Sequence, residues 1–463
     1  MSTVAYVRVK EQIKLTETEK KIFEMLLSTV RHFNLKTQLR VAGGWVRDKL
    51  IGKECNDIDI ALDNMVGSEF CAIFPQAPCL YGHYTSRLIL FCSNPEQSKH
   101  LQTARICLFD VWIDFVNLRS EYYSENSRIP TEMRFGTAEE DANRRDLTIN
   151  SLHLCFAFDS FHLITAGIED LKFGRIVTPL APKDTFLDDP LRVLRAIRFG
   201  ARFDFILDEE LKKAAACDVV KDHLSDKIGR ELIGTEIDLM ISGNQPVKAI
   251  DHICGLTLFP VVFSPPPEVE PDTPEECYRL SAAYLDATWR LIQLIQGSSF
   301  DDERRRLALY SALFLPLRNA TYKDRKAKKI PAVNYIFRDS LKRKASDADT
   351  VSYKHPQVTG EILILDSFPL VNDDNQLNEV DWGREVVDVP ATSKLRVLTG
   401  LLLKEIKDFW RVALLMSTLL YPTDIDCTRD IVNRHFQLDK RKDLFVSTEN
   451  AIINLGLEKV WDL

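Results

Sequence analysis

The spacing of hydrophobic residues predicts a mixed α/β first part and a helical remainder. Hydrophobic side chains recur at helical period over residues 22–33, directly after Thr16 and Glu19, which have the spacing of a capping box. A short helix is expected at 45–50. Strands are predicted at 39–42, 58–62 and 112–118. From Pro190 onward nearly every hydrophobic pattern is helical, so the expected fold is a mixed sheet with helices followed by helical domains.

The length of the chain implies several packed units. A chain of 463 residues is too long for one ordinary core, so about two to four units are expected. A dense group of prolines within residues 259–276 breaks helices and marks a linker. The predicted division is a mixed α/β part at 1–165 and three helical parts at 166–258, 259–385 and 386–463.

Composition excludes some classes of protein. Hydrophobic residues make up 45% of the chain, but no apolar run reaches the roughly 18–20 residues of a membrane span, so no membrane partner is expected. Glu11, Glu17 and Glu19 argue against a transit peptide in this form. The expected compartment is therefore the cytoplasm or nucleus, while a longer form with a transit peptide would serve an organelle. The ten cysteines form no CxxC pair and are expected to be reduced.

The segment after the first predicted strand carries the strongest chemical signal. Side chains two positions apart on a strand share a face, so Asp57 and Asp59 would present two carboxylates side by side. Such close like charges need a counter-ion, and Mg²⁺ prefers carboxylate oxygens together with substrate phosphates. A pair of such ions would activate a 3′-hydroxyl and stabilise a departing pyrophosphate. Gly43 and Gly44 let a triphosphate approach the backbone, and Arg47 would add a charge-assisted contact.

Alternatives remain open for these carboxylates. Two solvated aspartates in a surface turn would give the same short pattern, and it is the preceding Gly-Gly-Trp-Val-Arg-Asp segment that favours catalysis. Asp114 is expected on a neighbouring strand as a third carboxylate that orients or deprotonates the attacking hydroxyl. The alternative for Asp114 is a polar residue at a strand edge.

Arginines gather in two later segments. They are Arg144 and Arg145, followed by Asp146, and then Arg192, Arg195 and Arg198 at positions i, i+3 and i+6. On a helix the second spacing places three guanidiniums along one stripe, with hydrophobic residues on the buried side. A triphosphate or an RNA backbone would relieve the repulsion between these charges.

Asp189 and Arg192 predict selection of a base. Cytosine and adenine both present an amino donor beside an acceptor nitrogen, so a carboxylate and an arginine would accept both. Uracil and guanine have the reverse polarity and would leave buried polar groups unpaired. Asp189 before Pro190 is also an ordinary helix start. If its oxygens cap the helix, Asp188 would select the base instead.

Together these segments resemble the class II tRNA nucleotidyltransferases, the CCA-adding enzymes that are related to bacterial poly(A) polymerases. The resemblance rests on four motifs in the family's order across residues 40–205. They are Gly-Gly-Trp-Val-Arg-Asp at 43–48, Asp-Ile-Asp at 57–59, Arg-Arg-Asp-Leu-Thr-Ile-Asn at 144–150 and Asp-Asp-Pro-Leu-Arg-Val-Leu-Arg-Ala-Ile-Arg-Phe at 188–199. Residues 94–101 and 115–121 look like the eukaryotic branch of the family.

The resemblance implies an α/β nucleotidyltransferase head at 1–165, followed by helical neck, body and tail domains. It implies that Asp57 and Asp59 bind two Mg²⁺ ions, and that Gly44, Arg47 and Arg145 contact the incoming triphosphate. It also implies a pocket for CTP and then ATP, formed by Asp189, Arg192, Arg195 and Arg198. The implied activity is template-independent addition of C, C and A to the 3′ end of tRNA. Bacterial relatives carry Glu-Asp where this chain has Asp188-Asp189, a departure that leaves Asp189 in place.

A chain with a net charge of −8 needs a local basic surface to bind tRNA. One segment of the predicted body supplies it. Its basic residues are Lys323, Arg325, Lys326, Lys328 and Lys329. Such residues suit phosphate contacts that position an RNA without recognising its sequence, although a solvated charged face is the alternative.

Rival functions share the same motifs. They are addition of CC only or A only, poly(A) synthesis, and a catalytically silent tRNA-binding protein. The intact Asp57 and Asp59 argue against the silent protein. The chain is expected to be a monomer or a weak homodimer.

Overall fold

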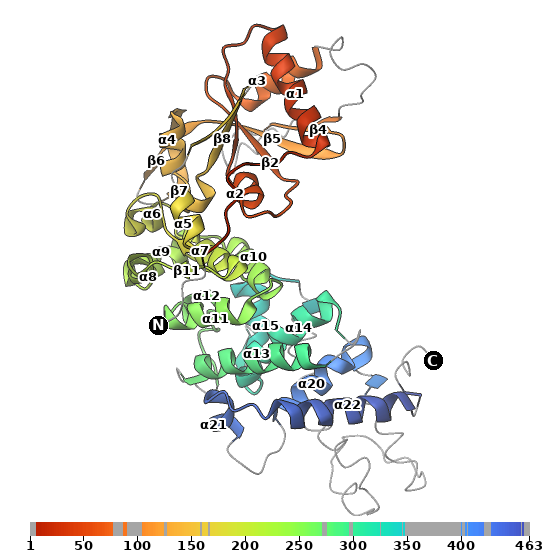
Figure 1. Cartoon of the computed structure of the whole chain (residues 1–463). Coiled ribbons are helices and arrows are strands. Elements are labelled where there is room, and N and C mark those ends of the chain that lie inside the picture. Colours follow the sequence, from red (N-terminus) through yellow and green to blue (C-terminus); the bar gives the residue numbers. More distant parts are fainter. Residues whose placement is uncertain are drawn as a thin grey trace, which may run out of the picture. The chain divides into compact units, whose positions relative to one another are not determined.

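The computed structural model of the chain is shown in Figure 1. It describes residues 6–76, 87–89, 104–124, 127–157, 160–164, 167–270, 276–295, 300–324, 326–344, 346–347, 400, 403–404, 406–420, 427–454 and 456–457. These residues belong to two compact units, Met1–Ile228 and Gly229–Leu463.

A seven-stranded mixed sheet is the centre of the first unit, in the order β3-β4-β5-β2-β1-β8-β9. Its strands are β1 (Leu39–Ala42), β2 (Ile58–Leu62), β3 (Arg87–Ile89), β4 (Ala104–Leu108), β5 (Val111–Asn117), β8 (His153–Ala157) and β9 (Ser160–Ile164). The pair β2–β5 is parallel and the other neighbouring pairs are antiparallel. The parallel register places Asp59 opposite Asp114.

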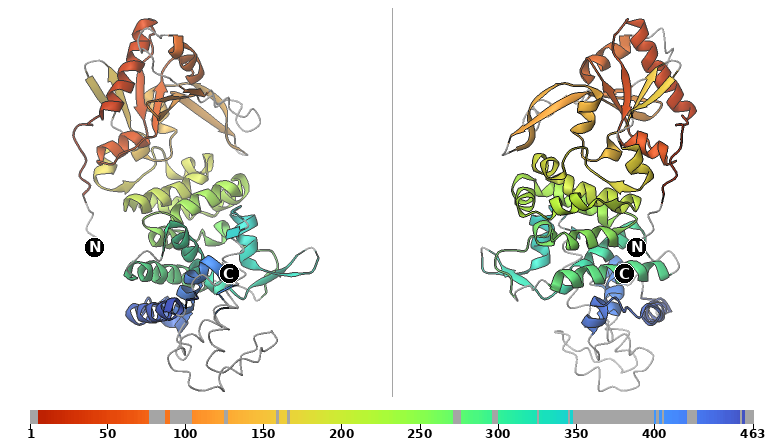
Figure 2. Two further views of the ribbon diagram at one scale, coloured as in Figure 1. Left: turned by 90° about the vertical axis from the view of Figure 1, so that its right-hand side faces the viewer. Right: turned by 60° about the vertical axis from the view of Figure 1, so that its left-hand side comes forward.

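Helices and a hairpin accompany this sheet (Figure 2). They are α1 (Glu17–His32), α2 (Gly44–Leu50), α3 (Gly67–Ile73), η1 (Phe74–Gln76), the hairpin of β6 (Arg119–Ser124) and β7 (Ser127–Phe135), α4 (Ala138–Asn143) and η3 (Thr148–Asn150). The predicted capping box is confirmed, because the backbone N–H of Glu19 donates to Thr16 Oγ1 at 3.2 Å and that of Thr16 donates to Glu19 Oε2 at 2.7 Å. Phe23 of α1 packs against Trp45 and Phe156, so α1 closes the core over α2 and β8.

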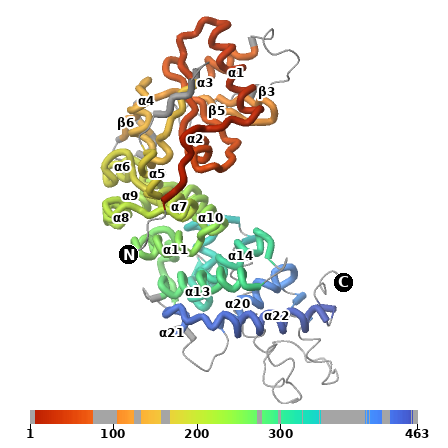
Figure 3. The backbone as a smooth tube through the Cα atoms, in the orientation of Figure 1, coloured from red at the N-terminus to blue at the C-terminus, as the bar shows by residue number. Residues whose placement is uncertain are grey.

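Short helices and one small sheet complete the first unit, and Figure 3 traces their path. They are α5 (Ile168–Lys172), β10 (Arg175–Ile176), α6 (Pro182–Asp188), α7 (Leu191–Phe203), β11 (Ile206–Leu207), α8 (Glu209–Ala215) and α9 (Asp218–Lys227), with β10 and β11 parallel. Helix α7 buries Val193, Leu194 and Ile197, as its pattern predicts.

The second unit is mostly helical. Its elements are α10 (Arg230–Ile241), α11 (Pro246–Gly255), α12 (Phe259–Val262), α13 (Glu276–Leu294), α14 (Asp302–Leu313), η4 (Leu315–Leu317), the hairpin of β12 (Thr321–Lys323) and β13 (Lys329–Pro331), α15 (Ala332–Tyr335), the π-helix η5 (Ile336–Ser340), η7 (Lys407–Phe409), α20 (Trp410–Leu420), α21 (Cys427–Val432) and α22 (Leu438–Asn454). Leu291, Ala312, Trp410 and Phe445 belong to one hydrophobic core shared by α13, α14, α20 and α22.

The predicted fold class is confirmed, with differences in detail. The strands at 39–42 and 58–62 are found as predicted, and the third strand is shifted by one residue to Val111–Asn117. The small sheets β10–β11 and β12–β13 interrupt the helical part. The proline-rich linker begins later than expected, because α12 buries Phe259 and Val262.

Several other expectations bear on the organisation of the chain. The boundary between the two compact units, at Ile228 and Gly229, falls within the predicted neck. The predicted boundary at 385 lies outside the described residues, and the division into four domains stays a prediction. Among the described cysteines, Cys55, Cys71, Cys107, Cys155, Cys217, Cys254 and Cys277 are free thiols. None of the described helices has the length and hydropathy of a membrane span.

The buried contacts of Glu19 give a test of how α1 is held. Its Oε1 accepts from the Trp45 indole at 3.1 Å and pairs with the Lys49 ammonium at 2.9 Å, where Lys49 is only 5% exposed. We expect Glu19→Ala to lower the free energy of unfolding by about 3 kcal/mol. The substitution leaves the buried ammonium of Lys49 with Glu54 as its remaining acidic partner. Calorimetry of the full chain measures the fall in melting temperature.

Glu17→Ala is the matched control, because Glu17 lies in the same turn but its exposed carboxylate pairs with Lys20 at the surface. No measurable change is expected for that variant. Equal melting temperatures for the two variants would contradict the role assigned to Glu19.

Candidate active site

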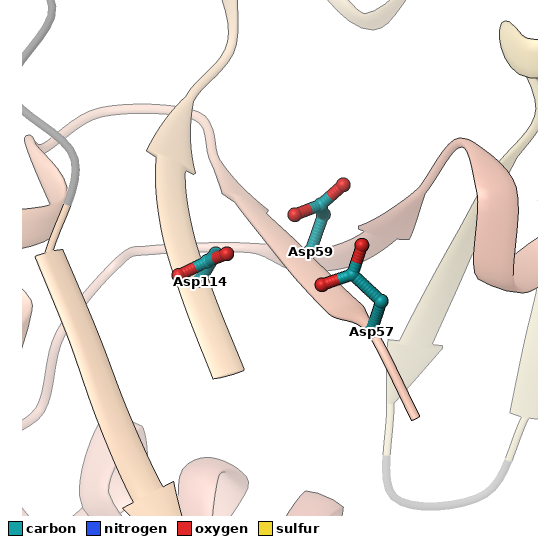
Figure 4. A group of neighbouring side chains, drawn as sticks. All are labelled: Asp57, Asp59 and Asp114. Carbon is teal, nitrogen blue, oxygen red and sulfur yellow. The ribbon is translucent and has the colours of Figure 1, made fainter. Parts of the chain in front are cut away.

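Three carboxylates from two neighbouring strands lie together at the sheet. Oxygen atoms of Asp57, Asp59 and Asp114 all lie within 4.8 Å of one another. Figure 4 shows Asp57 and Asp59 coming from the same segment of chain and Asp114 from the strand beside it. Strand β5 lies between β4 and β2, so Asp114 is not at an edge of the sheet. The cluster is therefore made by the register of β2 with β5, together with the alternation of side chains along β2.

The charges of this cluster are only partly balanced by the protein. Burial and the neighbouring Asp57 raise the pKa of Asp59 to about 6, against the lowering effect of Arg145. Arg105, which faces Asp114 from β4, donates from Nε and Nη2 to both carboxylate oxygens of Asp114. Carboxylate oxygens crowded in this way fit a hard divalent cation, which would remove the remaining repulsion.

Asp57 and Asp59 face a cavity of about 590 Å³ that brings most of the predicted nucleotide site together. The predicted residues that line it are Gly43, Gly44, Arg47, Asp57, Asp59, Arg144, Arg145, Asp146, Asp189, Arg192 and Arg195. Asp114 and Arg198 do not line it. The cavity joins a carboxylate cluster to a group of arginines, which is the arrangement that a metal-bound triphosphate requires.

Arg144 and Arg145 are held by a carboxylate that the sequence interpretation missed. Asp141, on α4 and only 1% exposed, accepts from Arg144 Nε at 2.9 Å and from Arg145 Nε and Nη2 at 3.0 and 2.9 Å. His153 Nε2 lies 3.0 Å from the same carboxylate. Burial alone would raise the pKa of Asp141, but Arg145, His153 and Arg144 outweigh it and hold that pKa well below its usual range. The i, i+3 and i+4 spacing of these charges on a helix is the signal that could have revealed Asp141.

Gly43 is required where Arg145 crosses the backbone. Its φ of +76° lies in the region that favours glycine, and a Cβ there would lie 2.9 Å from Arg145 Nη1. The same nitrogen donates to the backbone carbonyl of Asn150 at 3.2 Å. Gly43 therefore leaves room for the Arg145 guanidinium beside the start of α2.

Arg47 and Asp146 belong to a second buried network. Arg47 Nε donates to Asp48 Oδ1 at 2.8 Å, and Arg47 Nη1 donates to the Asn150 side chain. Asp146 accepts from Asn150 Nδ2 at 3.1 Å and from Arg195 Nε at 2.8 Å. Asn150 thus joins both sides of the cavity, and the sequence interpretation gave it no role.

Helix α7 presents its arginines differently from the predicted stripe. Arg192 is 8% exposed and Arg195 lines the cavity beside it. Arg198 does not line the cavity, although its guanidinium lies 4.3 Å from the centre of the Phe199 ring, which does. Asp189 Oδ1 accepts from the backbone N–H of Leu191 at 3.2 Å, so one oxygen caps the helix while the residue still lines the cavity.

Several lining residues were not predicted. They are Trp45, Asp48, Cys55, Val116, Arg119, Asn150, Phe199 and Arg202. Most of them lie within or next to the predicted motifs, but their side-chain type alone does not distinguish a cavity residue from a core residue.

The predicted tRNA-binding residues lie in the second unit, at the β12–β13 hairpin. Lys323, Lys326, Lys328 and Lys329 are exposed, and Arg325 lies outside the described residues. Asp324 Oδ1 accepts from the backbone N–H groups of Lys326 and Lys328, both at 2.8 Å. The acid in this segment therefore holds the turn, while the lysines face solvent.

Comparison with known proteins agrees with this geometry. Residues 39–177 match the family model described as the poly A polymerase head domain. The tRNA nucleotidyltransferase cca2 of Schizosaccharomyces pombe is 35% identical over 349 residues, which cover 72% of this chain and 71% of that protein. The mitochondrial CCA tRNA nucleotidyltransferase of Candida glabrata is 42% identical over 263 residues, covering 54% of this chain and 49% of the relative. The chain thus spans about half the length of some of the curated relatives that it matches.

Solved structures support the fold. A complex of a CCA-adding enzyme with CTP has a TM-score of 0.57 at 18% identity, covering 95% of this chain and 96% of that one. The head fold and its carboxylate cluster define a nucleotidyltransferase, a class that implies dependence on a divalent metal. More narrowly, the chain belongs to the tRNA nucleotidyltransferase family, and the predicted resemblance is confirmed.

We expect the carboxylate cluster to favour metal binding while lowering the stability of the metal-free protein. We expect Asp59→Asn to weaken Mn²⁺ binding by roughly tenfold or more, because it removes a charged ligand at the centre of the cluster. The same variant should raise the melting temperature of the metal-free protein, since it removes one of three crowded negative charges. Paramagnetic resonance of free Mn²⁺ and calorimetry measure the two effects.

Asp110→Asn is the control, because Asp110 is exposed in the β4–β5 turn, where its φ of +61° suits asparagine. It should change neither quantity. Unaltered Mn²⁺ affinity in Asp59→Asn would exclude the cluster as the metal site.

Proposed function

We propose that this protein adds C, C and A to the 3′ end of tRNA without a nucleic-acid template, using CTP and ATP. The observation that carries the proposal is one cavity lined both by Asp57 and Asp59 and by Asp189 and Arg192. The first pair suits transfer of a nucleotide and the second suits choice of its base. The relatives named CCA tRNA nucleotidyltransferase support the same function.

Asp57 and Asp59 would hold two Mg²⁺ ions, with Asp114 as the adjoining third carboxylate. When bound, such ions activate the 3′-hydroxyl of the acceptor and stabilise the leaving pyrophosphate. Arg47 and Arg145 line the same cavity and would bind the triphosphate oxygens. Both guanidiniums are already oriented by Asp48 and Asp141, so little conformational entropy is lost when the phosphates arrive.

Base selection would fall to Asp189 and Arg192. Because Asp189 uses Oδ1 as a helix cap, Oδ2 is the oxygen that would accept from the amino group of cytosine or adenine. Arg192 would donate to the adjacent ring nitrogen. Uracil and guanine present a carbonyl to the carboxylate and an N–H to the guanidinium, so both contacts would be repulsive.

The exposed lysines of the β12–β13 hairpin would contact tRNA phosphates. The mitochondrial names of two relatives support an organelle form of the enzyme. Presence in the cytoplasm or nucleus, and a monomeric or weakly dimeric state, stay predictions.

Product lengths on tRNA that lacks its 3′ end test the proposed function. With CTP alone we expect two added residues, with ATP alone none, and with both nucleotides three. A ladder of many A residues would instead indicate poly(A) synthesis, which the name of the matching head family makes the leading rival. Products that stop after CC would indicate a CC-adding enzyme, and addition of A to tRNA that already ends in CC without any incorporation of C would indicate an A-adding enzyme.

Asp57→Ala is the catalytic control for this assay. It should abolish incorporation of both nucleotides while tRNA binding, measured by filter retention, changes little. Normal turnover by Asp57→Ala would exclude the proposed two-metal chemistry.

Two of the arginines of α7 offer a matched pair for a test of base selection. Arg192→Ala should raise misincorporation of UTP and GTP relative to CTP and ATP by roughly tenfold or more, because a buried donor to the ring nitrogen is lost. Arg198→Ala, at a position that does not line the cavity, should leave the ratio close to that of the natural protein. Single-turnover incorporation with each nucleotide measures the ratio, and equal ratios in both variants would refute the role of Arg192.

A further inference from the structure

Tyr123, on the β6–β7 hairpin, contacts Arg192, the arginine proposed to select the base. Arg192 Nη2 donates to Tyr123 Oη at 3.3 Å and to the backbone carbonyl of Arg144 at 2.7 Å. Tyr123 Oη in turn donates to Glu121 Oε2 at 2.6 Å. Strand β6, which carries none of the three clustered aspartates, therefore takes part in holding Arg192.

The direction of these hydrogen bonds is fixed by Glu121. Its side chain is 5% exposed, and it accepts from Arg119 Nε at 2.6 Å and from Arg144 Nη1 at 3.2 Å. Burial would raise the pKa of Glu121, but Arg144 and Arg119 outweigh it and lower that pKa, so the carboxylate is ionised and only accepts. The single phenolic proton of Tyr123 goes to Glu121, which leaves a lone pair of Oη for Arg192.

The contacts of Arg192 orient its guanidinium within the cavity. In the described part of the chain, both of its side-chain hydrogen bonds use Nη2. Two acceptors on one nitrogen of a planar group set the plane of the whole group, so they also direct Nε and Nη1. Arg192 lines the cavity and is nearly buried, and its orientation therefore decides which base edge it can meet.

We propose that Tyr123 is a specificity-determining positioning residue, which holds Arg192 so that its free donors meet the acceptor nitrogen of cytosine or adenine. This proposal rests on the proposed function of the cavity. Tyr123 itself does not contact the base. The effect of Tyr123 passes through Arg192. Glu121, which accepts from Tyr123, also pairs with Arg144, and Arg144 is held by Asp141.

Tyr123→Phe tests the proposal, because it removes the hydroxyl and keeps the ring. We expect the preference for CTP over UTP and for ATP over GTP, expressed as ratios of kcat/KM, to fall by about tenfold. Mn²⁺ affinity and melting temperature should stay close to those of the natural protein. The matched control is Tyr122→Phe, one residue earlier on the opposite face of β6, where Tyr122 is 52% exposed. This control should retain the full preference.

A double variant separates an action through Arg192 from any other. In Arg192→Ala, adding Tyr123→Phe should cause no further loss of preference, because the partner is already gone. An unchanged preference in the single Tyr123 variant, or a further loss of about tenfold in the Arg192→Ala background, would overturn the proposal. If the natural protein incorporates neither CTP nor ATP, the proposed function fails first and the proposal with it. An active natural protein with an unchanged Tyr123→Phe ratio counts against Tyr123 alone.

Discussion

The buried carboxylate of Asp141 is the interaction on which the cavity depends. It lies at the end of α4 and binds Arg144 through one oxygen and Arg145 through the other, with His153 behind it. Arg145 then lies against Gly43, and the backbone carbonyl of Arg144 receives Arg192. Removing one partner of such a buried pair leaves the other charge uncompensated, which typically costs about 3–5 kcal/mol. Asp141 therefore holds two of the arginines on the nucleotide side of the cavity, although it does not itself line the cavity.

The charges on the nucleotide side and on the metal side of the cavity are compensated to different extents. Most arginines on the nucleotide side have an acidic partner close by, such as Asp146 for Arg195 and Glu121 for Arg144. The metal side keeps Asp57 and Asp59 crowded, which raises the pKa of Asp59 to about 6. A sheet optimised for stability would not place like charges in this register. The imbalance is concentrated where a cation would bind, in keeping with the rule that strain in a fold collects at the residues that do chemistry.

Local pattern predicted the elements of the head well, because short-range chemistry decides them. The capping box of Thr16 and Glu19 and the alternation over 58–62 depend on neighbours along the chain, and both elements formed as expected. Arg198 shows the limit. Arg198 follows Arg195 by the same three residues that separate Arg195 from Arg192. Each such step turns the side chain further around the helix axis, and Arg198 no longer lines the cavity. Asp141 and Asn150 went unrecognised because their roles depend on partners brought together only by the folded chain.

The position of Asp189 is compatible both with capping and with the proposed base selection. A carboxylate has two oxygens, and the cap uses only Oδ1, which accepts from the backbone of Leu191. That bond fixes the side chain at the start of α7, one helical turn before Arg192, whose own guanidinium is held by Arg144 and Tyr123. Acceptor and donor are thus both immobilised before any nucleotide enters. A fixed pair of opposite polarity rejects uracil and guanine by leaving buried groups unpaired, which discriminates more strongly than the shape of an apolar pocket.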